Sequence, residues 1–383
     1  MEAEDRCRVE EQLIFTDEPM THWQIADMDR LLLWAVEQSA SDICLQPNQS
    51  VWIRQHGQWI PVTTRDVTSE EIFEMVDQIS GTASSSAQLK GAGDLDFAYE
   101  ISTGRFTSER FRINATACRD GWGTGAELTL RSIPSIPPRI EDLGVEPEIL
   151  ESAFPDRGLV LVTGTVGSGK STLLCSMLRH IRETQRRKII TFEHPVEFDL
   201  MSIPNPMGPL VQTGIPEHLS QFGHSPRNAM RRACDVILVG ESRDRETLWG
   251  MLEAAETGTV AYSTVHTQSV ADTPTRIINV FPADMQQQVA GALLSSLRLV
   301  IQQRLEPSPK GGRVAIKEYL AFDRDVREQL MHAGLRELSG AVDKLVEERG
   351  RPLIEDVRKK YEQGLIFKET LDKITKETER DDA

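Results

Sequence analysis

Residues 158–174, with the sequence GLVLVTGTVGSGKSTLL, decide the fold of the larger part of the chain. An apolar run typical of a buried strand leads into a turn that matches G-x-x-x-x-G-K-[ST] from Gly164 to Ser171, and a helical pattern follows. The glycines let the backbone wrap tightly, so that consecutive N–H groups point at phosphate oxygens, and the following helix adds its positive N-terminal end. The stretch therefore predicts a site for a nucleoside triphosphate and Mg²⁺.

Two side chains of this loop have specific expected roles. Lys170 is expected to reach the β- and γ-phosphates, and the hydroxyl of Ser171 is expected to bind Mg²⁺. The backbone of the loop is expected to supply most of the other phosphate contacts. The expected nucleotide-binding residues are Gly164, Thr165, Val166, Gly167, Ser168, Gly169, Lys170, Ser171 and Thr172.

Three further apolar runs follow the loop, and each ends in a chemically capable side chain. KIITFEH (188–194), DVILVGE (235–241) and VAYSTVH (260–266) are short, bounded by turn residues and separated by helical or irregular stretches. This pattern is typical of buried parallel strands with helical crossovers, and therefore of an α/β fold. Because parallel strands present their carboxyl ends at one edge of a sheet, all three side chains are expected beside the phosphate loop.

The two carboxylates are expected to divide the catalytic work. Glu241 follows a glycine at the end of its strand, and its natural role is to orient Mg²⁺, directly or through water. Glu193 ends a neighbouring run and could position and activate the attacking water. His266 could donate to the γ-phosphate and report its loss, or it could be a capping or core histidine.

The neighbouring pair Glu193–His194, followed by Pro195, allows three interpretations. It could be part of a metal site, a general base with its partner, or a surface turn, because proline disfavours helix in the residue before it. A zinc site formed by Glu193, His194 and His266 is an alternative, although these residues lack the i, i+4 spacing of common histidine sites.

The N-terminal third shows a different pattern, which predicts a small α+β domain. Helical periodicity spans 27–43, and a capping residue with acids in the first turn begins a second helix over 69–80. The expected strands lie in 42–46, 51–62, 94–101, 109–119 and 125–133, and one later strand is expected in 311–322.

Five segments are expected along the chain. Residues 1–20 form a flexible arm, 21–135 the N-terminal domain, 136–150 a linker, 151–325 the phosphate-loop domain and 326–383 a helical C-terminal tail. The linker is placed by the stretch PSIPPRIEDLGVEP, which is rich in proline and polar residues. The tail has mixed charge, which favours a packed amphipathic tail over a membrane element.

The composition limits the possible functions. The 43 basic and 59 acidic residues give a net charge of −16, which argues against broad binding of nucleic acid. The five cysteines are scattered without a CxxC pair, so they are expected to be reduced thiols of a cytosolic protein. No stretch approaches the ~20 apolar residues of a membrane span, and no signal peptide is expected.

Several stretches together resemble a known family. TGTVGSGKST, TFEHPVEF, RNAMRRACDVILVGESRD and AAETGTVAYSTVHTQSVADTPTRIINVFP occur in the order found in the PilT/VirB11-like ATPases of type II secretion, type IV pilus and type IV secretion machines. The resemblance covers nearly the whole chain. RINATAC, RNAMRR and the form of the tail resemble most the DotB-type ATPases of type IVB secretion and their counterpart TraJ in related conjugative plasmids.

This resemblance implies a fold, a cofactor and a set of roles. It implies a RecA-like ATPase domain, a smaller PAS-like N-terminal domain and a ring of six subunits that binds ATP and Mg²⁺. By position, Glu193 corresponds to the general base, Glu241 to the Walker B acid and His266 to the His-box histidine. Arg112 and Arg131 fall where N-terminal arginines of the family reach phosphates across a subunit boundary, although either could be a solvated strand residue.

The chain also departs from the family pattern. The usual GPTGSGKST reads GTVGSGKST, with Thr165 and Val166 at positions where the backbone makes the phosphate contacts. Ala233 and Cys234 replace the usual Asp-Pro before the Walker B strand, which puts any role of that turn in doubt. The four-cysteine zinc module of many pilus-assembly and type II members is absent, which argues against those branches.

The expected function is ATP hydrolysis by a hexameric motor that energises a type IVB secretion or conjugative transfer apparatus. The alternatives are a type IV pilus retraction motor and, from another class, a nucleotide-gated assembly or adaptor subunit with little turnover. The expected partners are further copies of the chain and inner-membrane components of the apparatus. A cytoplasmic protein, peripherally associated with the inner membrane, is therefore expected, and nucleic acid is not expected as a partner.

Overall fold

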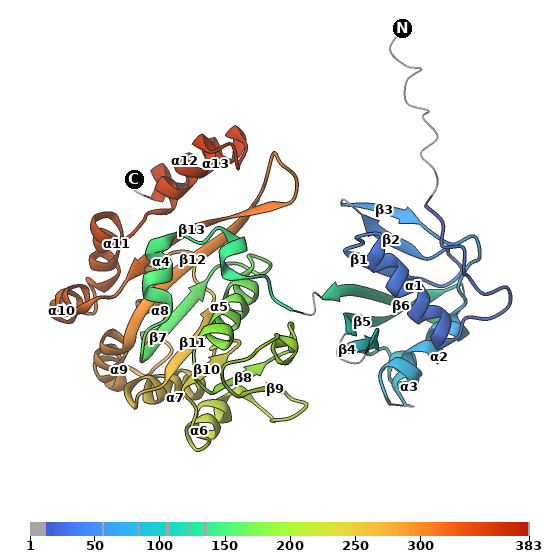
Figure 1. Cartoon of the computed structure of the whole chain (residues 1–383), viewed down its shortest axis with the longest axis horizontal. Coiled ribbons are helices and arrows are strands. Elements are labelled where there is room, and N and C mark those ends of the chain that lie inside the picture. Colours follow the sequence, from blue (N-terminus) through green and yellow to red (C-terminus); the bar gives the residue numbers. More distant parts are fainter. Residues whose placement is uncertain are drawn as a thin grey trace, which may run out of the picture. The chain divides into compact units, whose positions relative to one another are not determined.

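The computed structural model describes residues 13–381 except 56, 83, 105–107, 122 and 134–135, and it leaves out the side chains of 379–381. The chain divides into two compact units, Met1–Ser135 and Ile136–Ala383 (Figure 1). Each unit has its own sheet and its own core, and each is described here by itself.

The described residues of the first unit form a six-stranded antiparallel sheet and three α-helices. The order of its strands is β3-β2-β1-β6-β5-β4. Its elements are α1 (Ile25–Glu37), β1 (Asp42–Leu45), β2 (Trp52–Gln55), β3 (Gln58–Pro61), α2 (Ser69–Ile79), α3 (Ser85–Lys90), β4 (Asp94–Ser102), β5 (Ser108–Asp120) and β6 (Gly123–Ile133). The expected small α+β unit is therefore confirmed.

Alternation along the strands decides which face of this sheet is covered. On β5, Phe111, Ile113 and Ala115 are fully buried in the core with α1 and α2, whereas the intervening Arg112 is exposed. Helix α2 begins one residue after Thr68, whose hydroxyl accepts from the N–H of Glu71 in a capping box. The cap explains why the helix begins at Ser69.

The expected arm, residues 1–20, lies mostly outside the described residues, but Phe15 corrects part of that prediction. Phe15 is buried against Trp23 and Trp34, and its N–H donates to the carbonyl of Val62 at 2.7 Å. The sequence hides this contact because the apolar run that ends in Phe15 is only three residues long, and Trp34 and Val62 lie far along the chain.

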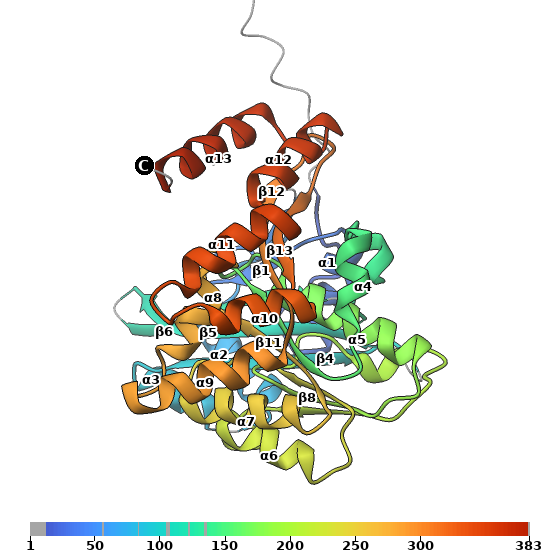
Figure 2. The same ribbon diagram turned by 90° about the vertical axis from the view of Figure 1, so that its left-hand side faces the viewer.

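The second unit is a seven-stranded sheet of order β13-β12-β7-β11-β10-β8-β9 with helices on both faces (Figures 1 and 2). All its paired strands are parallel except β13, which runs antiparallel to β12. Its strands are β7 (Gly158–Thr163), β8 (Ile189–Glu193), β9 (Leu210–Gly214), β10 (Val236–Val239), β11 (Val260–Val265), β12 (Leu297–Pro307) and β13 (Arg313–Ala321). Its α-helices are α4 (Pro147–Ala153), α5 (Lys170–Thr184), α6 (Ser225–Met230), α7 (Arg245–Glu256), α8 (Asp272–Ile278), α9 (Ala283–Ser296), α10 (Arg324–His332), α11 (Leu338–Arg349), α12 (Leu353–Glu362) and α13 (Lys368–Asp381). Short 3₁₀ helices are η1 (Ile140–Leu143), η2 (Leu200–Ser202) and η3 (Phe222–His224).

The central strands are apolar on both faces because each face has its own core. Leu159 and Leu161 of β7 pack with α7, α8 and α9, whereas Val160 and Val162 of the same strand pack with α4 and α5. All six residues of β7 are buried, as the unbroken apolar run predicts for a central parallel strand. The expected α/β class is therefore confirmed.

Two strands of this sheet were not predicted. The edge strand β9 contains Gln212 and Thr213, and its short polar pattern resembles a loop. Strand β12 begins at Leu297, directly after α9 ends at Ser296. No Gly, Pro or other strong turn residue marks this junction, so the start of the strand is hidden in a helical pattern.

The described part of the C-terminal tail forms α10, α11, α12 and α13 (Figure 2). Of these, α11 and α12 pack on β13, and α13 joins the hairpin through Ile374, in one apolar cluster with Ile316, and through the pair of Glu377 with Arg304. The helical stretch expected near the end is divided, because Gly364 adopts a left-handed φ of 65° between α12 and α13. Within the expected linker, η1 and the start of α4 are ordered structure. Among the described residues, no helix is long and apolar enough to cross a membrane.

Candidate active site

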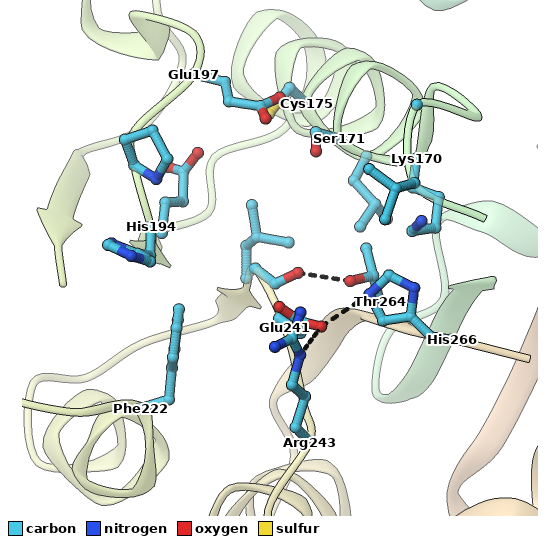
Figure 3. Close-up of a pocket in the computed structure, with 17 residues that line it drawn as sticks. Lys170, Ser171, Cys175, His194, Glu197, Phe222, Glu241, Arg243, Thr264 and His266 are labelled. Atoms are coloured by element: carbon cyan, nitrogen blue, oxygen red, sulfur yellow. Dashed lines mark hydrogen bonds and ion pairs between the residues drawn. The ribbon is translucent and has the colours of Figure 1, made fainter. Parts of the chain in front are cut away.

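Four adjacent parallel strands bring the expected site residues to one edge of the sheet. The strands lie in the order β7, β11, β10, β8; the phosphate loop follows β7, and His266, Glu241 and Glu193 lie at the carboxyl ends of the other three. These side chains line one cavity of about 250 Å³ together with Lys170 and Ser171 (Figure 3). The expectation of a shared edge is therefore confirmed.

The backbone of the phosphate loop is shaped by close contact with β12. Gly164 has φ of 139°, and a Cβ atom at this position would lie 2.3 Å from the carbonyl oxygen of Gln303. The side-chain amide of Gln303 donates to the carbonyl of Ser168 at 2.7 Å. Any larger residue in place of Gly164 would push the loop away from the sheet.

Lys170 lies inside the loop rather than in open solvent. Its Nζ donates to the carbonyls of Gly164 at 2.9 Å and Thr165 at 2.8 Å. Burial lowers the pKa of Lys170, although the charges of Glu241 and Glu197 oppose this shift. The ammonium also lines the cavity that holds Ser171 and Glu241, where it can meet a phosphate.

The expected loop residues do not all line the same space. Val166, Gly167, Lys170 and Ser171 line the cavity with the carboxylates. Thr165 and Ser168 line a groove on the other side of the loop, which they share with Val166 and Gly167. Gly169 and Thr172 line a third cavity, of about 560 Å³, together with residues 142–145 of the expected linker.

The carboxylate of Glu193 is oriented by two neighbouring side chains. Thr191 Oγ1 donates to Glu193 Oε1 at 2.6 Å, and Gln212 Nε2 donates to the same oxygen at 3.1 Å. Gln212 is itself fixed, because it also donates to the carbonyl of Phe198 and accepts from the N–H of Leu200. Glu193 is 5% exposed, so its position is set by the protein and not by solvent.

One ring nitrogen of His194 is bonded to the backbone. Its Nδ1 lies 2.5 Å from the carbonyl oxygen of Ile215, which can only accept, so Nδ1 carries the proton. Where side chains are described, no group of three or more histidine, cysteine, aspartate or glutamate residues could hold a metal ion. The alternative of a zinc site built from Glu193, His194 and His266 therefore finds no support here.

The carboxylate of Glu241 has two donors on one oxygen. His266 Nε2 lies 2.8 Å from Glu241 Oε1, and Arg243 Nε donates to the same oxygen (Figure 3). The hydroxyl of Thr264 donates to the carbonyl of Gly240 at 2.7 Å, which fixes the backbone just before Glu241. A carboxylate and the hydroxyl of Ser171 in one cavity are oxygen donors of the kind that Mg²⁺ prefers.

The two arginines expected to contact phosphate belong to the first unit. Arg112 of β5 lies directly opposite Arg131 of β6, so both side chains leave the same face of the sheet. Arg131 is paired with Asp42 at 2.8 Å, whereas Arg112 is exposed. The register extends the row to Arg54, which lies opposite Asp42. The proposed contacts of Arg112 and Arg131 with phosphate stay predictions.

Three residues of the site were not predicted. Arg243 could have been predicted from the sequence, because it follows Glu241 by two residues and should therefore lie at the same edge of the sheet. Glu197 lies four residues after Glu193 and approaches Cys175, where burial and the charges of Glu193 and Glu197 raise the pKa of the thiol. Gln212 had no signal, because its strand was not predicted.

Comparison with known proteins gives consistent matches over nearly the whole chain. The family model described as "Type II/IV secretion system protein" matches residues 24–373. The X-ray structure of the Legionella pneumophila ATPase DotB is 36% identical, covers 95% of this chain and 99% of that chain, and superposes with a TM-score of 0.85. A crystal structure of the pilus retraction motor PilT with bound ADP is 31% identical over 89% of this chain and 95% of that chain, with a TM-score of 0.77. The type IV pilus retraction ATPase PilT of Pseudomonas aeruginosa is 32% identical over 82% of this chain and 88% of that protein.

These matches confirm the RecA-like fold class with a smaller N-terminal domain, and they confirm the expected resemblance to PilT/VirB11-like ATPases, with DotB and PilT among the matching structures. The phosphate loop and the structure of PilT with bound ADP together identify a nucleotide-binding protein. It is an ATPase of a secretion or pilus system, and the chain belongs to the type II/IV secretion system protein family.

Proposed function

We propose that this chain is the Mg²⁺-dependent ATPase subunit of a hexameric motor that energises a type IVB secretion or conjugative transfer apparatus. One observation carries the catalytic part of the proposal. Glu193 and Glu241, from the neighbouring strands β8 and β10, face the same cavity as Lys170 and Ser171. Hydrolysis requires both a group that activates water and a group that holds the metal, and the two carboxylates can supply them.

Each side chain has a role that its surroundings favour. Glu193, held by Thr191 and Gln212, is the proposed general base, because a fixed carboxylate can accept the proton of an attacking water. Glu241 and Ser171 would hold Mg²⁺, which neutralises charge that develops on the phosphates. Lys170 binds the β- and γ-phosphates, and His266 contacts the γ-phosphate.

In the proposed ring, a neighbouring subunit would supply a second set of positive charges at the phosphates. Arg112 and Arg131 would reach across a subunit boundary, where a fixed fork of donors suits the charge of the transition state. This part of the proposal is supported by the position of both arginines on one face of the N-terminal sheet. It requires a homohexamer or another closed ring.

The choice of apparatus is supported by similarity alone. The match to Legionella DotB has a higher identity and TM-score than the match to the PilT structure, 36% and 0.85 against 31% and 0.77. The retraction motor of a type IV pilus is the second candidate, supported by a relative 32% identical over 82% of this chain. Both candidates share the same chemistry and differ in their partners.

The proposed location follows from the proposed partners. A motor of this kind would work in the cytoplasm and attach to inner-membrane components of its apparatus through protein contacts. Loss of conjugative transfer or secretion on deletion of the gene, with pilus retraction unchanged, would support the first candidate. The reverse phenotype would replace it with the second candidate.

The catalytic proposal is tested with purified protein and two variants. Glu193→Gln should retain binding of a fluorescent ATP analogue while phosphate release falls about 10²- to 10⁴-fold, as expected for loss of a general base. Lys170→Ala should lose binding as well. If Glu193→Gln binds ATP and releases phosphate like an active wild type, Glu193 is not the general base and the proposed mechanism is wrong. If the wild type itself binds ATP but releases phosphate no faster than Glu193→Gln, at the background rate, a nucleotide-gated adaptor becomes the better description. Sedimentation with ATP at micromolar concentration tests the ring.

A further inference from the structure

The side chain of Arg243 is bonded to the carboxylate of Glu241, which the proposed mechanism assigns to Mg²⁺. Its Nε donates to Glu241 Oε1, the same oxygen that lies 2.8 Å from His266 Nε2. A carboxylate oxygen accepts through two lone pairs, and two nitrogens already approach this one. Mg²⁺ bound by Glu241 at that oxygen would therefore displace one of them, and Arg243, whose side chain is 72% exposed against 38% for His266, is the one free to leave.

The backbone of Arg243 is fixed on both sides, while its side chain is not. Before it, the N–H of Ser242 donates to the carbonyl of Thr264 at 3.2 Å. After it, Asp244 caps α7 by accepting from the N–H of Thr247 at 2.8 Å. The Arg243 side chain is 72% exposed, so the guanidinium can turn about an anchored backbone. This arrangement suits a residue that changes partner without refolding.

The same cavity offers Arg243 a second partner. Arg243 lines the cavity with Lys170, Ser171 and Glu241, where the phosphates of a nucleotide would lie. Figure 3 shows its side chain reaching up to Glu241, on the side of the cavity where His266 lies. A planar fork of donors matches phosphate oxygens better than any other side chain does. An arginine released from Glu241 would find the terminal phosphate within the same space.

We propose that Arg243 exchanges between two partners: the carboxylate of Glu241, and the terminal phosphate of ATP once a divalent cation takes that carboxylate. This inference rests on the proposed Mg²⁺–ATP chemistry and adds a residue to it. The exchange would link metal binding to recognition of the third phosphate. ADP lacks that phosphate, so Arg243 would also help the site distinguish ATP from ADP.

The test measures binding and not turnover. Fluorescent analogues of ATP and ADP are titrated onto the full-length protein, in EDTA and at increasing MgCl₂, for the wild type and Arg243→Gln. Without the competing guanidinium, the variant should need roughly two- to fivefold less Mg²⁺ for half-saturation, the range expected for an exposed ion pair. Its preference for ATP over ADP should fall about tenfold, because a charge-assisted contact with phosphate is lost.

Two further variants make the result specific. Arg245→Gln removes an exposed arginine that does not line the cavity, and it should titrate like the wild type. Arg243→Lys keeps the charge but loses the fork, so it should retain the competition with Mg²⁺ and lose part of the ATP preference. This variant also provides the test if Arg243→Gln does not fold.

The outcomes separate this inference from the proposed function. If Arg243→Gln leaves either the half-saturating Mg²⁺ or the ATP-to-ADP ratio at the wild-type value, the two-partner assignment is wrong. If the wild type binds ATP equally well in EDTA and in MgCl₂, both the proposed metal and this inference are wrong. If Glu193→Gln hydrolyses ATP normally while the titrations shift as expected, only the proposed mechanism is wrong.

Discussion

Lys360 of α12 donates to Glu146 at the start of α4, 3.0 Å away and 214 residues earlier in the chain. The same ammonium donates to Asp356 at 2.6 Å, and Lys317 of β13 donates to Glu146 at 3.1 Å. All four side chains are buried. Burial alone would raise the pKa of Glu146, but Lys317 and Lys360 lower it to about 2. This cluster ties the C-terminal helices to the segment that begins the second unit.

Removal of one charge from this cluster should be severe. Lys360→Met removes the cation that bonds both Glu146 and Asp356, leaving Lys317 on Glu146 and only a longer contact of Arg351 with Asp356 at 3.9 Å. Breaking a buried pair costs about 3–5 kcal/mol of unfolding free energy. Urea unfolding followed by circular dichroism measures the loss. Lys344→Met is the matched control, because Lys344 forms an exposed i, i+4 pair with Glu348 and should change stability little. Equal losses in the two variants would contradict a structural role for the cluster.

Local patterns in the sequence predict the centre of the site but not its surroundings. The phosphate loop and the strand ends at Glu193, Glu241 and His266 are predictable, because a glycine turn and apolar runs dictate them locally. The bond between Lys360 and Glu146 is not predictable, since it depends on how distant elements pack. Gln212 was missed for a related reason, because a polar edge strand has no distinctive period.

Errors at the boundaries of elements also have physical causes. Strand β12 escaped prediction because α9 runs into it without a turn residue, so that helical and extended patterns merge at Leu297. The burial of Phe15 could not be predicted, because the apolar run of Leu13, Ile14 and Phe15 is too short to show a period. In both cases, tertiary packing decides what local propensity leaves open.

Stability should depend on pH through Glu318. Burial raises its pKa to about 6, Asp343 and Asp272 add to the shift, and the N–H of Val270 donating to Glu318 opposes it. Between its ordinary pKa of 4.5 and the folded-state pKa of about 6, Glu318 binds more protons in the folded state than in the unfolded state, so stability falls as pH rises through this range.

Glu318→Gln should remove this penalty and retain the acceptor for Val270. At pH 8 the variant should be more stable than the wild type by up to about 2 kcal/mol, and the difference should vanish near pH 4. Thermal unfolding across this pH range, with the exposed Glu347→Gln as the control, measures the effect. A variant that is less stable than the wild type at pH 8 would contradict this account of Glu318.

The position of Glu193 should depend on a single hydroxyl. Thr191→Val keeps the shape of a fully buried side chain but removes the 2.6 Å hydrogen bond to Glu193 Oε1. If Glu193 is the general base, kcat should fall roughly tenfold while KM stays unchanged, because a charged hydrogen bond is lost in the transition state. Thr259→Val is the control, since the hydroxyl of Thr259 donates to the carbonyl of Cys234 at the other end of the strand, before β11 begins. A rise in KM without a fall in kcat would exclude a positioning role.

The proposed cross-subunit role of Arg112 gives a test that uses two inactive variants. Arg112→Gln lacks the arginine but keeps an intact phosphate loop, whereas Lys170→Ala lacks phosphate binding but keeps Arg112. Arg112 is chosen because Arg131 is held by Asp42 at 2.8 Å, and its removal would also break that pair.

If Arg112 acts on a neighbouring subunit, a mixture of the two variants contains complete sites at some boundaries. Each variant alone should be nearly inactive. A random one-to-one mixture should regain activity at about a quarter of its sites, because a complete site needs the Arg112→Gln variant as the subunit that supplies the phosphate loop and the Lys170→Ala variant as the neighbour that supplies Arg112. Steady-state phosphate release after co-refolding or co-expression measures the recovery. If the mixture shows only the mean activity of the two separate variants, Arg112 either acts on a phosphate bound by its own subunit or has no catalytic role. Mixing Lys170→Ala with Glu193→Gln is the control, because those two changes affect the same subunit's cavity and should not complement each other.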